Sequence, residues 1–267
     1  GSRAFGRGPW PLHPSPGGLR TFVRASMLRG QKVLVTGAGR GIGAAIAEAL
    51  AQEGAQMILC ARRKEELEAT AVKCEMSPGA CMHMAQVLVF DLSSQEGVDG
   101  LVTEVLKGGG VDVLVNNAGC MLPGNATEGN LEDFDRQMYL NLVGPMRLTR
   151  QLAPKMVDRR RGTIINVGSV AALEAMSGAN AVYAASKHGL RGWSLSIYES
   201  LRDTNVKVML VNPAYVNTPL VSRIEGVNHD KMIKPSDVAE TCLLPFRVSA
   251  DCVPTEVTLR LALRATV

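Results

Sequence analysis

Four glycines lie within the eight residues TGAGRGIG, at positions 36–43, between an apolar run and an alanine-rich segment. The run QKVLVT at 31–36 is typical of a buried strand, and GIGAAIAEALAQEG at 41–54 is typical of a helix that Gly54 ends. Gly37 permits a tight turn out of the strand, because glycine adopts backbone conformations that strain other residues. The segment therefore predicts a strand, a short glycine-rich turn and a helix in immediate succession.

The rest of the chain repeats this alternation of strand and helix. Its strands are rich in Val, Ile and Leu, as expected for a parallel sheet that helices cover on both faces. The sequence therefore predicts an α/β fold, a Rossmann-type doubly wound parallel sheet of about seven strands, formed by residues 27–267 as one domain. The further strands are predicted at 55–61, 84–92, 111–119, 162–169, 206–216 and 256–263, and the further helices at 63–76, 94–108, 130–160, 181–203 and 235–246.

Residues 1–26 are predicted to lie outside this domain. Of the 29 basic residues, five arginines fall within 1–29, where there is no acid, so the other 24 basic and 25 acidic residues leave the body near −1. The net charge of +4 therefore describes this segment and does not indicate a nucleic-acid-binding surface. Two interpretations of 1–26 stay open: a disordered or cloning-derived extension, and an arginine-rich organellar transit peptide.

The cysteines and the apolar runs bear on the cellular compartment. The six cysteines form no CxxC motif, and Cys74, Cys81 and His83 match no zinc-binding spacing. We therefore expect unlinked thiols, no metal site and a reducing compartment. No run of about 18 apolar residues occurs, so no membrane span is predicted. The expected location is the cytoplasm, or a mitochondrion or plastid if residues 1–26 are a transit peptide.

The segment YAASK places Tyr183 and Lys187 four residues apart, on one face of a predicted helix. A lysine cation beside a phenol lowers the tyrosine pKa from its usual value of about 10, so that the tyrosine can act as a general acid or base. A lone pair of this kind is more often an ordinary surface pair. Here, however, Ser169 ends a strand upstream, Asn141 lies in the preceding helical region, and NNAG at 116–119 closes the fourth strand. This joint occurrence favours catalysis.

These motifs, in this order, resemble those of the short-chain dehydrogenase/reductase family, and the match runs from about residue 30 to 260. The resemblance implies that Tyr183 exchanges a proton with the substrate oxygen and that Ser169 hydrogen-bonds the same oxygen. It also implies that Lys187 lowers the pKa of Tyr183 and binds the nicotinamide ribose, and that Asn141 fixes a water in the proton relay. Hydride would pass to or from C4 of the nicotinamide, which interconverts a carbonyl and a secondary alcohol.

The glycine-rich turn is the predicted dinucleotide site, with the pyrophosphate at the helix N-terminus. A site for NAD places an acid at the end of the second strand, but LCARRK at 59–64 has none, and Arg62 and Arg40 offer cations instead. This favours NADP(H), although arginines at strand ends commonly just face solvent. The resemblance assigns Asp91 to the adenine amino group, with helix capping as its alternative. The predicted cofactor-binding residues are Gly37, Gly39, Arg40, Gly41, Ile42, Gly43, Arg62, Arg63, Asp91, Asn117, Ala118, Gly119, Tyr183, Lys187, Pro213, Val216 and Thr218.

The substrate is expected to be a small neutral carbonyl or alcohol. The segments that the resemblance places around it are 120–122, 171–176 and 215–234, and they are mostly apolar. Substitution of Ala214 for the glycine that usually follows Pro213 in the family predicts a slightly different setting of the loop over the nicotinamide.

Two other functions stay open. One is a 3-oxoacyl-carrier-protein reductase, for which Arg147, Arg150 and the run 159–161 would form a basic docking patch beside the cleft. The other is a non-catalytic NADP-binding sensor or scaffold of the same fold, which would have no need of Tyr183 and Lys187.

A homodimer or homotetramer is also predicted. The helices around 133–157 and 183–203 carry more apolar residues than a helix with one buried face requires, and this surplus would form the subunit contact. The residues concerned are Phe134, Met138, Leu148, Trp193, Leu195 and Tyr198.

Overall fold

The computed structural model describes residues 26–81, 84–176, 178–221 and 228–263. Several sequence predictions lie outside these residues. They concern the extension at 1–25, His83, the centre of the substrate segment at 222–227, and the end of the chain at 264–267.

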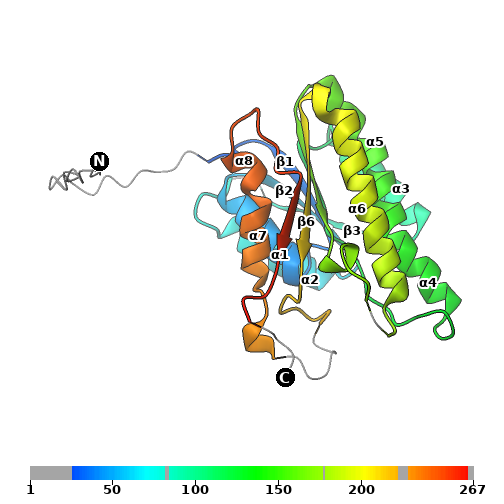
Figure 1. Cartoon of the computed structure of the whole chain (residues 1–267). Helices are drawn as coiled ribbons and strands as arrows, with labels where there is room; N and C mark the ends of the chain where they lie inside the picture. Colours follow the sequence, from blue (N-terminus) through cyan, green and yellow to red (C-terminus); the bar gives the residue numbers. More distant parts are fainter. Residues whose placement is uncertain (1–25, 82–83, 177, 222–227, 264–267) are drawn as a thin grey trace, which may run out of the picture.

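Seven parallel strands form one sheet in the order β3-β2-β1-β4-β5-β6-β7 (Figure 1). This confirms the predicted doubly wound sheet. The chain starts at β1 in the middle and winds outward in both directions, so a crevice opens between β1 and β4 at the carboxyl ends of the strands, where such sheets bind ligands. The strands are β1 Lys32–Thr36, β2 Gln56–Ala61, β3 Gln86–Val89, β4 Val113–Asn116, β5 Gly162–Val167, β6 Val206–Pro213 and β7 Glu256–Leu259.

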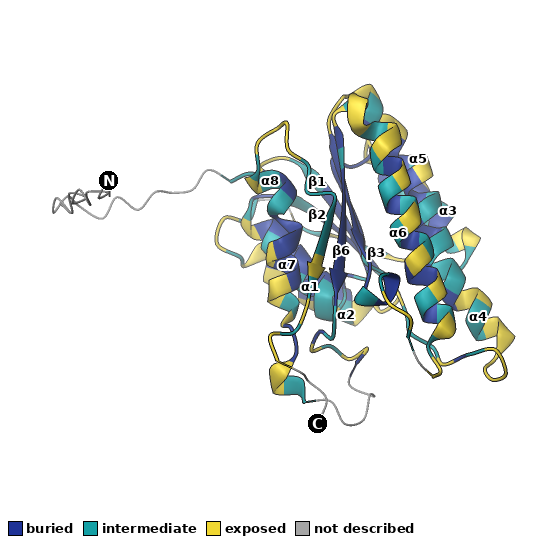
Figure 2. Ribbon diagram, in the orientation of Figure 1, coloured by how far each residue is buried: buried dark blue, intermediate teal, exposed yellow. Residues whose placement is uncertain are grey.

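Helices cover both faces of the sheet. Those of one face, α1, α2 and α7, lie on the opposite side from α3, α5 and α6, and the strands between them are mostly buried (Figures 1 and 2). Alternate side chains of β1 supply the two cores, since Val33 and Val35 face the first set and Leu34 the second. The helices are α1 Gly41–Gln52, α2 Lys64–Glu75, α3 Gln95–Lys107, α4 Leu131–Met138, α5 Gly144–Asp158, α6 Ala181–Leu201, α7 Pro235–Cys242 and α8 Leu244–Arg247.

The structure differs from the predicted elements in two places near the crevice. The long helix expected at 130–160 is interrupted by a π-helix, η1 Tyr139–Val143, just before Pro145. Proline has no N–H to donate to the carbonyl four residues earlier, so the regular helix cannot continue unbroken there. The last strand ends at Leu259 and not at 263, because its partner β6 ends at Pro213, which pairs with Leu259.

Among the described residues, no group of three or more His, Cys, Asp or Glu side chains could hold a metal ion. No helix in the same part of the chain is long and apolar enough to cross a membrane.

Candidate active site

A cavity of about 780 Å³ opens at the carboxyl ends of the strands. Every residue predicted to bind the cofactor lines it, from the glycine turn after β1 to Pro213, Val216 and Thr218 after β6. Ser169, Tyr183 and Lys187 line the same cavity, although they lie more than a hundred residues after the glycine turn in the sequence. One cleft therefore holds both predicted halves of the site.

The glycine turn is shaped by close backbone contacts. Gly37 has a φ of +65°, and a Cβ added to it would lie 2.9 Å from Cα of Ala118. A Cβ added to Gly43 would lie 2.1 Å from the carbonyl oxygen of Gly37. The turn therefore needs glycine at both positions, the first for its left-handed backbone and the second for the packing of α1 on the strand.

The N-terminus of α1 faces the cavity. Its N-cap residue, Arg40, makes no capping hydrogen bond with its side chain, so the first amide groups of the helix keep their donors for a ligand. Uncapped N–H groups and the positive end of the helix dipole form a binding site for phosphate. Together with the glycine cradle, this end of the cavity fits the pyrophosphate of a dinucleotide.

Side chains from two strand ends hold the turn in place. The hydroxyl of buried Thr36 accepts hydrogen bonds from the amides of Asn117 (3.0 Å) and Ala118 (3.1 Å). The side-chain amide of Asn117 donates to the carbonyl oxygens of Thr36 (2.9 Å) and Gly37 (3.3 Å). The NNAG segment therefore fastens the glycine turn of β1 onto the end of β4.

The four predicted catalytic residues come together, although Asn141 lies behind the cavity wall. Asn141 is fully buried in η1. Its side chain accepts a hydrogen bond from the backbone N–H of Cys120 and donates one to the carbonyl oxygen of Cys120, each at 2.9 Å. It also donates to the hydroxyl of Ser186 at 3.0 Å. Lys187 donates to the carbonyl oxygen of Val167 at 2.9 Å. π-Helices are frequent at functional sites, and here the extra residue in the turn directs Asn141 toward the NNAG segment.

The pKa of Tyr183 departs from what we expected, and that of Lys187 is also shifted. Burial raises the pKa of Tyr183, and a hydrogen bond with Ser169 lowers it in part. Burial lowers the pKa of Lys187 to about 8. The pKa of Tyr183 is therefore raised and not lowered as we expected from the lysine cation: the Nζ atom lies 5.8 Å from the centre of the ring, and desolvation disfavours both charged forms.

The predicted phosphate-binding arginines each have a carboxylate partner. Arg62 pairs with Asp91 at 3.6 Å, which also accepts hydrogen bonds from Ser93, while Arg40 (3.7 Å) and Arg63 both pair with Glu66. Glu66 also lines the cavity. The end of β2 carries no acid, and Glu66, which was not predicted from the sequence, reaches the cleft from the first turn of α2.

The helix α2 approaches the glycine turn closely. A Cβ added to Gly39 would lie 3.0 Å from the Cβ atom of Glu66. The hydroxyl of Thr70 on the same helix donates to the carbonyl oxygen of Gly39 at 3.3 Å. The helix α2 is therefore packed directly against the glycine turn.

The other end of the cavity is mostly apolar, and the sequence identified only part of it. Cys120, Met121 and Tyr215 line it as expected, whereas Leu122 does not. The residues that sequence reasoning missed lie after β7, where Arg260 pairs with Glu174 of the predicted 171–176 segment. The additional lining residues after β7 are Leu261, Ala262 and Leu263.

The loop after β6 does not need the glycine that Ala214 replaces. Among the described residues other than glycine, only Arg160 and Asn205 have a positive φ. The amide of Ala214 donates to the carbonyl oxygen of Leu259 at 2.9 Å, so the loop continues the pairing of β6 with β7. Alanine is therefore accommodated here without backbone strain.

The arginine run 159–161, part of the patch proposed for a carrier protein, is not beside the cleft. Residues 159–161 precede β5, and Arg159 (3.6 Å) and Arg161 (3.3 Å) pair with Asp112, which precedes β4. They therefore lie at the amino ends of the strands, opposite the cavity.

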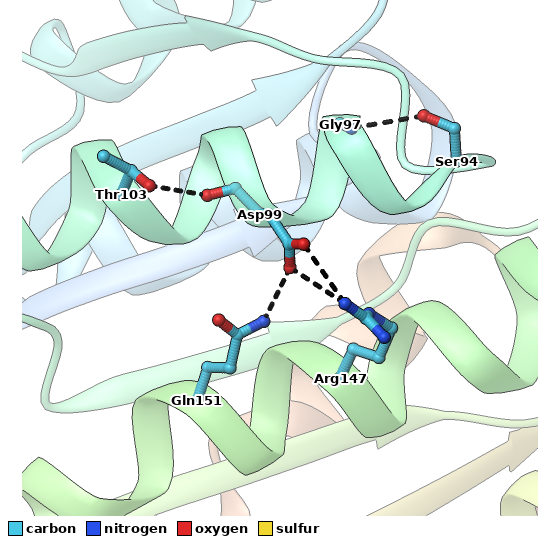
Figure 3. Close-up of polar contacts among 6 residues, drawn as sticks. All are labelled: Ser94, Gly97, Asp99, Thr103, Arg147 and Gln151. Atoms are coloured by element: carbon cyan, nitrogen blue, oxygen red, sulfur yellow. Dashed lines mark hydrogen bonds and ion pairs between the residues drawn. The ribbon is translucent and has the colours of Figure 1, made fainter.

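Arg147 of the same proposed patch has partners on a neighbouring helix. Its guanidinium donates to both carboxylate oxygens of Asp99 on α3, at 3.1 and 3.2 Å (Figure 3). Gln151, one turn further along α5, donates to the same carboxylate at 3.0 Å. These contacts fasten α5 to α3, so Arg147 is engaged within the chain.

Comparison with known proteins agrees with this geometry. The profile of the short chain dehydrogenase family matches residues 31–227. A "Dehydrogenase/reductase SDR family protein 7-like" from Anopheles gambiae is 35% identical over 231 residues, which cover 82% of this chain and 73% of that protein.

Two solved structures are also similar. A metagenomic short-chain oxidoreductase in complex with NADP has a TM-score of 0.76 and 34% identity, covering 89% of this chain and 100% of that one. A 3-oxoacyl (acyl-carrier-protein) reductase from Agrobacterium tumefaciens with NADP bound has a TM-score of 0.78 and 27% identity, covering 88% and 95%. With the glycine turn, the NNAG segment and the Ser–Tyr–Lys cleft on the same sheet, this chain belongs to the short-chain dehydrogenase/reductase family of oxidoreductases.

Proposed function

We propose that the chain is an NADP(H)-dependent oxidoreductase that interconverts a carbonyl and a secondary alcohol. The observation that carries this proposal is the single cavity shared by the glycine turn, the arginines after β2 and the residues Ser169, Tyr183 and Lys187. A binding-only sensor would have no use for a buried tyrosine and lysine beside the cofactor, so we favour the enzyme. The NADP-bound relatives described above support this choice of cofactor.

In the proposed reaction the bound nicotinamide supplies or accepts the hydride. The glycine turn and the N-terminus of α1 hold the pyrophosphate. Ser169 and Tyr183 hydrogen-bond the substrate oxygen, and Tyr183 gives or takes its proton. Lys187 binds the nicotinamide ribose and stabilises the phenolate, which requires the lysine to stay protonated despite the burial that lowers its pKa to about 8. Asn141 holds the backbone of Cys120, directly after the NNAG segment, and belongs to the proton relay.

Arg62→Ala is expected to weaken NADPH binding by about 10- to 100-fold, because a hydrogen bond to a charged group contributes roughly 1.5–3 kcal/mol. The loss should fall toward the lower end, since Arg62 must leave Asp91 in order to bind the 2′-phosphate. NADH lacks that phosphate, so its affinity should hardly change. Fluorescence titration with both cofactors measures the ratio, and an equal loss for both would assign Arg62 a structural role.

Glu66→Gln is a second variant for the same titration, and it is expected to change the affinity for NADPH in the opposite direction. It keeps the volume of the side chain and removes the charge that holds Arg40 and Arg63. Both arginines then become available to the 2′-phosphate, so NADPH should bind more tightly and NADH should not. A decrease in NADPH affinity would mean that Glu66 orients the arginines for the phosphate and does not compete with it.

The substrate that the cavity favours is a neutral carbonyl or alcohol with an apolar body. The charges of Glu174 and Arg260 offset each other in an ion pair at this end of the cavity. Leu220 and Leu263 line it with 42% and 66% of their surfaces exposed, which suits an apolar molecule entering from solvent. A structural relative that is a carrier-protein reductase keeps the carrier-protein alternative open, but Arg147, Arg159 and Arg161 of the patch assigned to it pair with acids elsewhere in the fold.

A panel of substrates tests the function directly. Consumption of NADPH, followed by its absorbance, is expected with neutral ketones and aldehydes that carry an apolar chain. A 3-oxoacyl-carrier-protein substrate is included as the rival, and turnover of that substrate alone would select the carrier-protein reductase. Tight NADPH binding without turnover of any of these compounds would favour the sensor or scaffold.

The assembly into a homodimer or homotetramer remains a proposal. Some of the apolar residues from which the assembly was predicted pack inside the subunit. Leu148 is buried, and Trp193 and Tyr198 pack against the core. The apolar surface that α4, α5 and α6 leave for a partner is therefore smaller than the sequence indicates.

A further inference from the structure

Glu256, the first residue of the edge strand β7, connects two parts of the fold that carry the proposed catalytic groups. Its Oε1 and Oε2 atoms accept hydrogen bonds from Nε (2.7 Å) and Nη2 (3.0 Å) of Arg191 on α6. Oε1 also accepts a hydrogen bond from the side-chain amide of Asn212 on β6, at 2.7 Å. One carboxylate therefore links a helix to the neighbouring strand.

The Asn212 side chain connects Glu256 to Ser169 through hydrogen bonds at its two ends. Asn212 is fully buried, and its Oδ1 atom accepts a hydrogen bond from the backbone N–H of Ser169 at 3.2 Å. The side-chain amide of asparagine has a donor end and an acceptor end, whereas a carboxylate only accepts. Because Glu256 takes the donor end, the carbonyl end must face Ser169. A reversed amide would set two donors against each other at Ser169.

Arg191 extends the connection to the other catalytic groups. It lies four residues after Lys187 and eight after Tyr183 on the same helix, α6. Residues four apart lie on one face of a helix, so Arg191 fixes the face that carries Tyr183 and Lys187. Ser169 follows β5 and forms a hydrogen bond with Tyr183 of α6. The relative position of the two residues therefore depends on how α6 packs against the sheet.

We propose that Glu256 is a positioning residue for the reaction: through Asn212 and Arg191 it holds the Ser169 backbone and the helix of Tyr183 in register. The proposal rests on the proposed function, because it gives Ser169 and Tyr183 their roles. A carboxylate 22% exposed that ties a fully buried asparagine differs from an ordinary surface ion pair. A pair of the ordinary kind lies at the end of the same helix, where Glu199 of α6 and Arg202 just after it are 2.9 Å apart with more than half of each side chain exposed.

The test is the variant Glu256→Leu, with Glu199→Gln as the matched control. Glu256→Leu removes both contacts, and a displacement of the order of 1 Å in a reacting group can cost about 100-fold in rate, so kcat on a neutral ketone should fall by about 10- to 100-fold. NADPH affinity by titration should stay within about twofold, because neither Asn212 nor Glu256 lines the cavity. Glu199→Gln should leave kcat and affinity unchanged, and an equal loss in the control would overturn the proposal.

A double-mutant cycle separates positioning from a general loss of structure. If Glu256 holds Ser169 in register with Tyr183, Glu256→Leu should cost little more once Ser169→Ala has removed the hydroxyl, because both variants disturb the same pairing of Ser169 with Tyr183. The same fold loss in both backgrounds would overturn the proposal. Glu256→Gln keeps an acceptor for Asn212, and it should recover most of kcat if the variant with leucine fails to fold.

A second readout does not depend on turnover. Hydrogen exchange of the peptide that contains Ser169 should accelerate in Glu256→Leu and stay unchanged in Glu199→Gln, since only the first removes the contact that keeps Oδ1 of Asn212 turned toward that amide. Unchanged exchange in Glu256→Leu would overturn the proposal. If exchange accelerates while Ser169→Ala leaves kcat intact, Glu256 does position the Ser169 backbone and the catalytic assignment of Ser169 has failed.

Discussion

Tyr183→Phe is expected to abolish most turnover while NADPH still binds. The substitution removes one hydroxyl and keeps the buried ring, so the packing of α6 should survive. No other group is then placed to exchange the proton with the substrate oxygen, and general acid–base catalysis typically contributes about 10²–10⁴-fold. The measurement is kcat on a verified ketone, together with the Kd of NADPH by fluorescence titration.

Tyr198→Phe on the same helix is the control for this experiment. It removes the same atom from a tyrosine that packs against the core away from the cleft, so kcat and Kd should both be retained. Near-normal kcat in Tyr183→Phe would show that the proton passes through another group. Family membership would then describe the fold and the nucleotide site without this chemistry.

Gly43→Ala is expected to weaken NADPH binding by about 10- to 100-fold. Its new methyl group would stand 2.1 Å from the carbonyl oxygen of Gly37 and 2.5 Å from the side-chain amide of Asn117. The first atom is backbone, and hydrogen bonds to the carbonyl oxygens of Thr36 and Gly37 hold the second, so the turn must move off α1. Overpacking of this kind costs roughly 1–3 kcal/mol. The same displacement moves the amides that would bind the pyrophosphate. Titration with NADPH and the Tm of the protein measure the two effects.

Gly192→Ala provides the comparison, because a Cβ there meets nothing within 4 Å. Alanine stabilises a helix interior relative to glycine by about 0.5–1 kcal/mol, so this variant should bind NADPH normally and melt at the same or a higher temperature. Normal NADPH affinity in Gly43→Ala would mean that the turn adapts and that the tight contact with Gly37 is not required for binding.

The sequence was sufficient to predict the sheet, the order of its elements along the chain and the segments that line the cofactor end of the cavity. Apolar strands that alternate with helices leave few arrangements other than a covered parallel sheet, and in such a sheet the residues after each strand meet at one edge. For this reason residues as far apart as Gly37, Asn117 and Ser169 line one cavity. The break in the long helix also had a sequence signal, in Pro145, that the periodicity of the apolar residues concealed.

The pKa values show the first limit of this reasoning. The spacing of Tyr183 and Lys187 correctly indicated that they share a helix, and it suggested that the cation would dominate the tyrosine. Burial dominates in the folded chain, raising the pKa of Tyr183 and lowering that of Lys187. The degree of desolvation depends on everything packed around a group, so a four-residue spacing cannot predict it.

The contacts that tune the site were decided by the tertiary structure alone. Glu66 reaches the arginines because α2 packs against the glycine turn, and Glu256 reaches Asn212 and Arg191 because β7 pairs with β6 next to α6. Local periodicity determines which face of an element is buried, and it carries no information on which polar side chain of another element stands opposite. That information depends on the register of the strands and the seating of the helices, which arise only when the whole core packs.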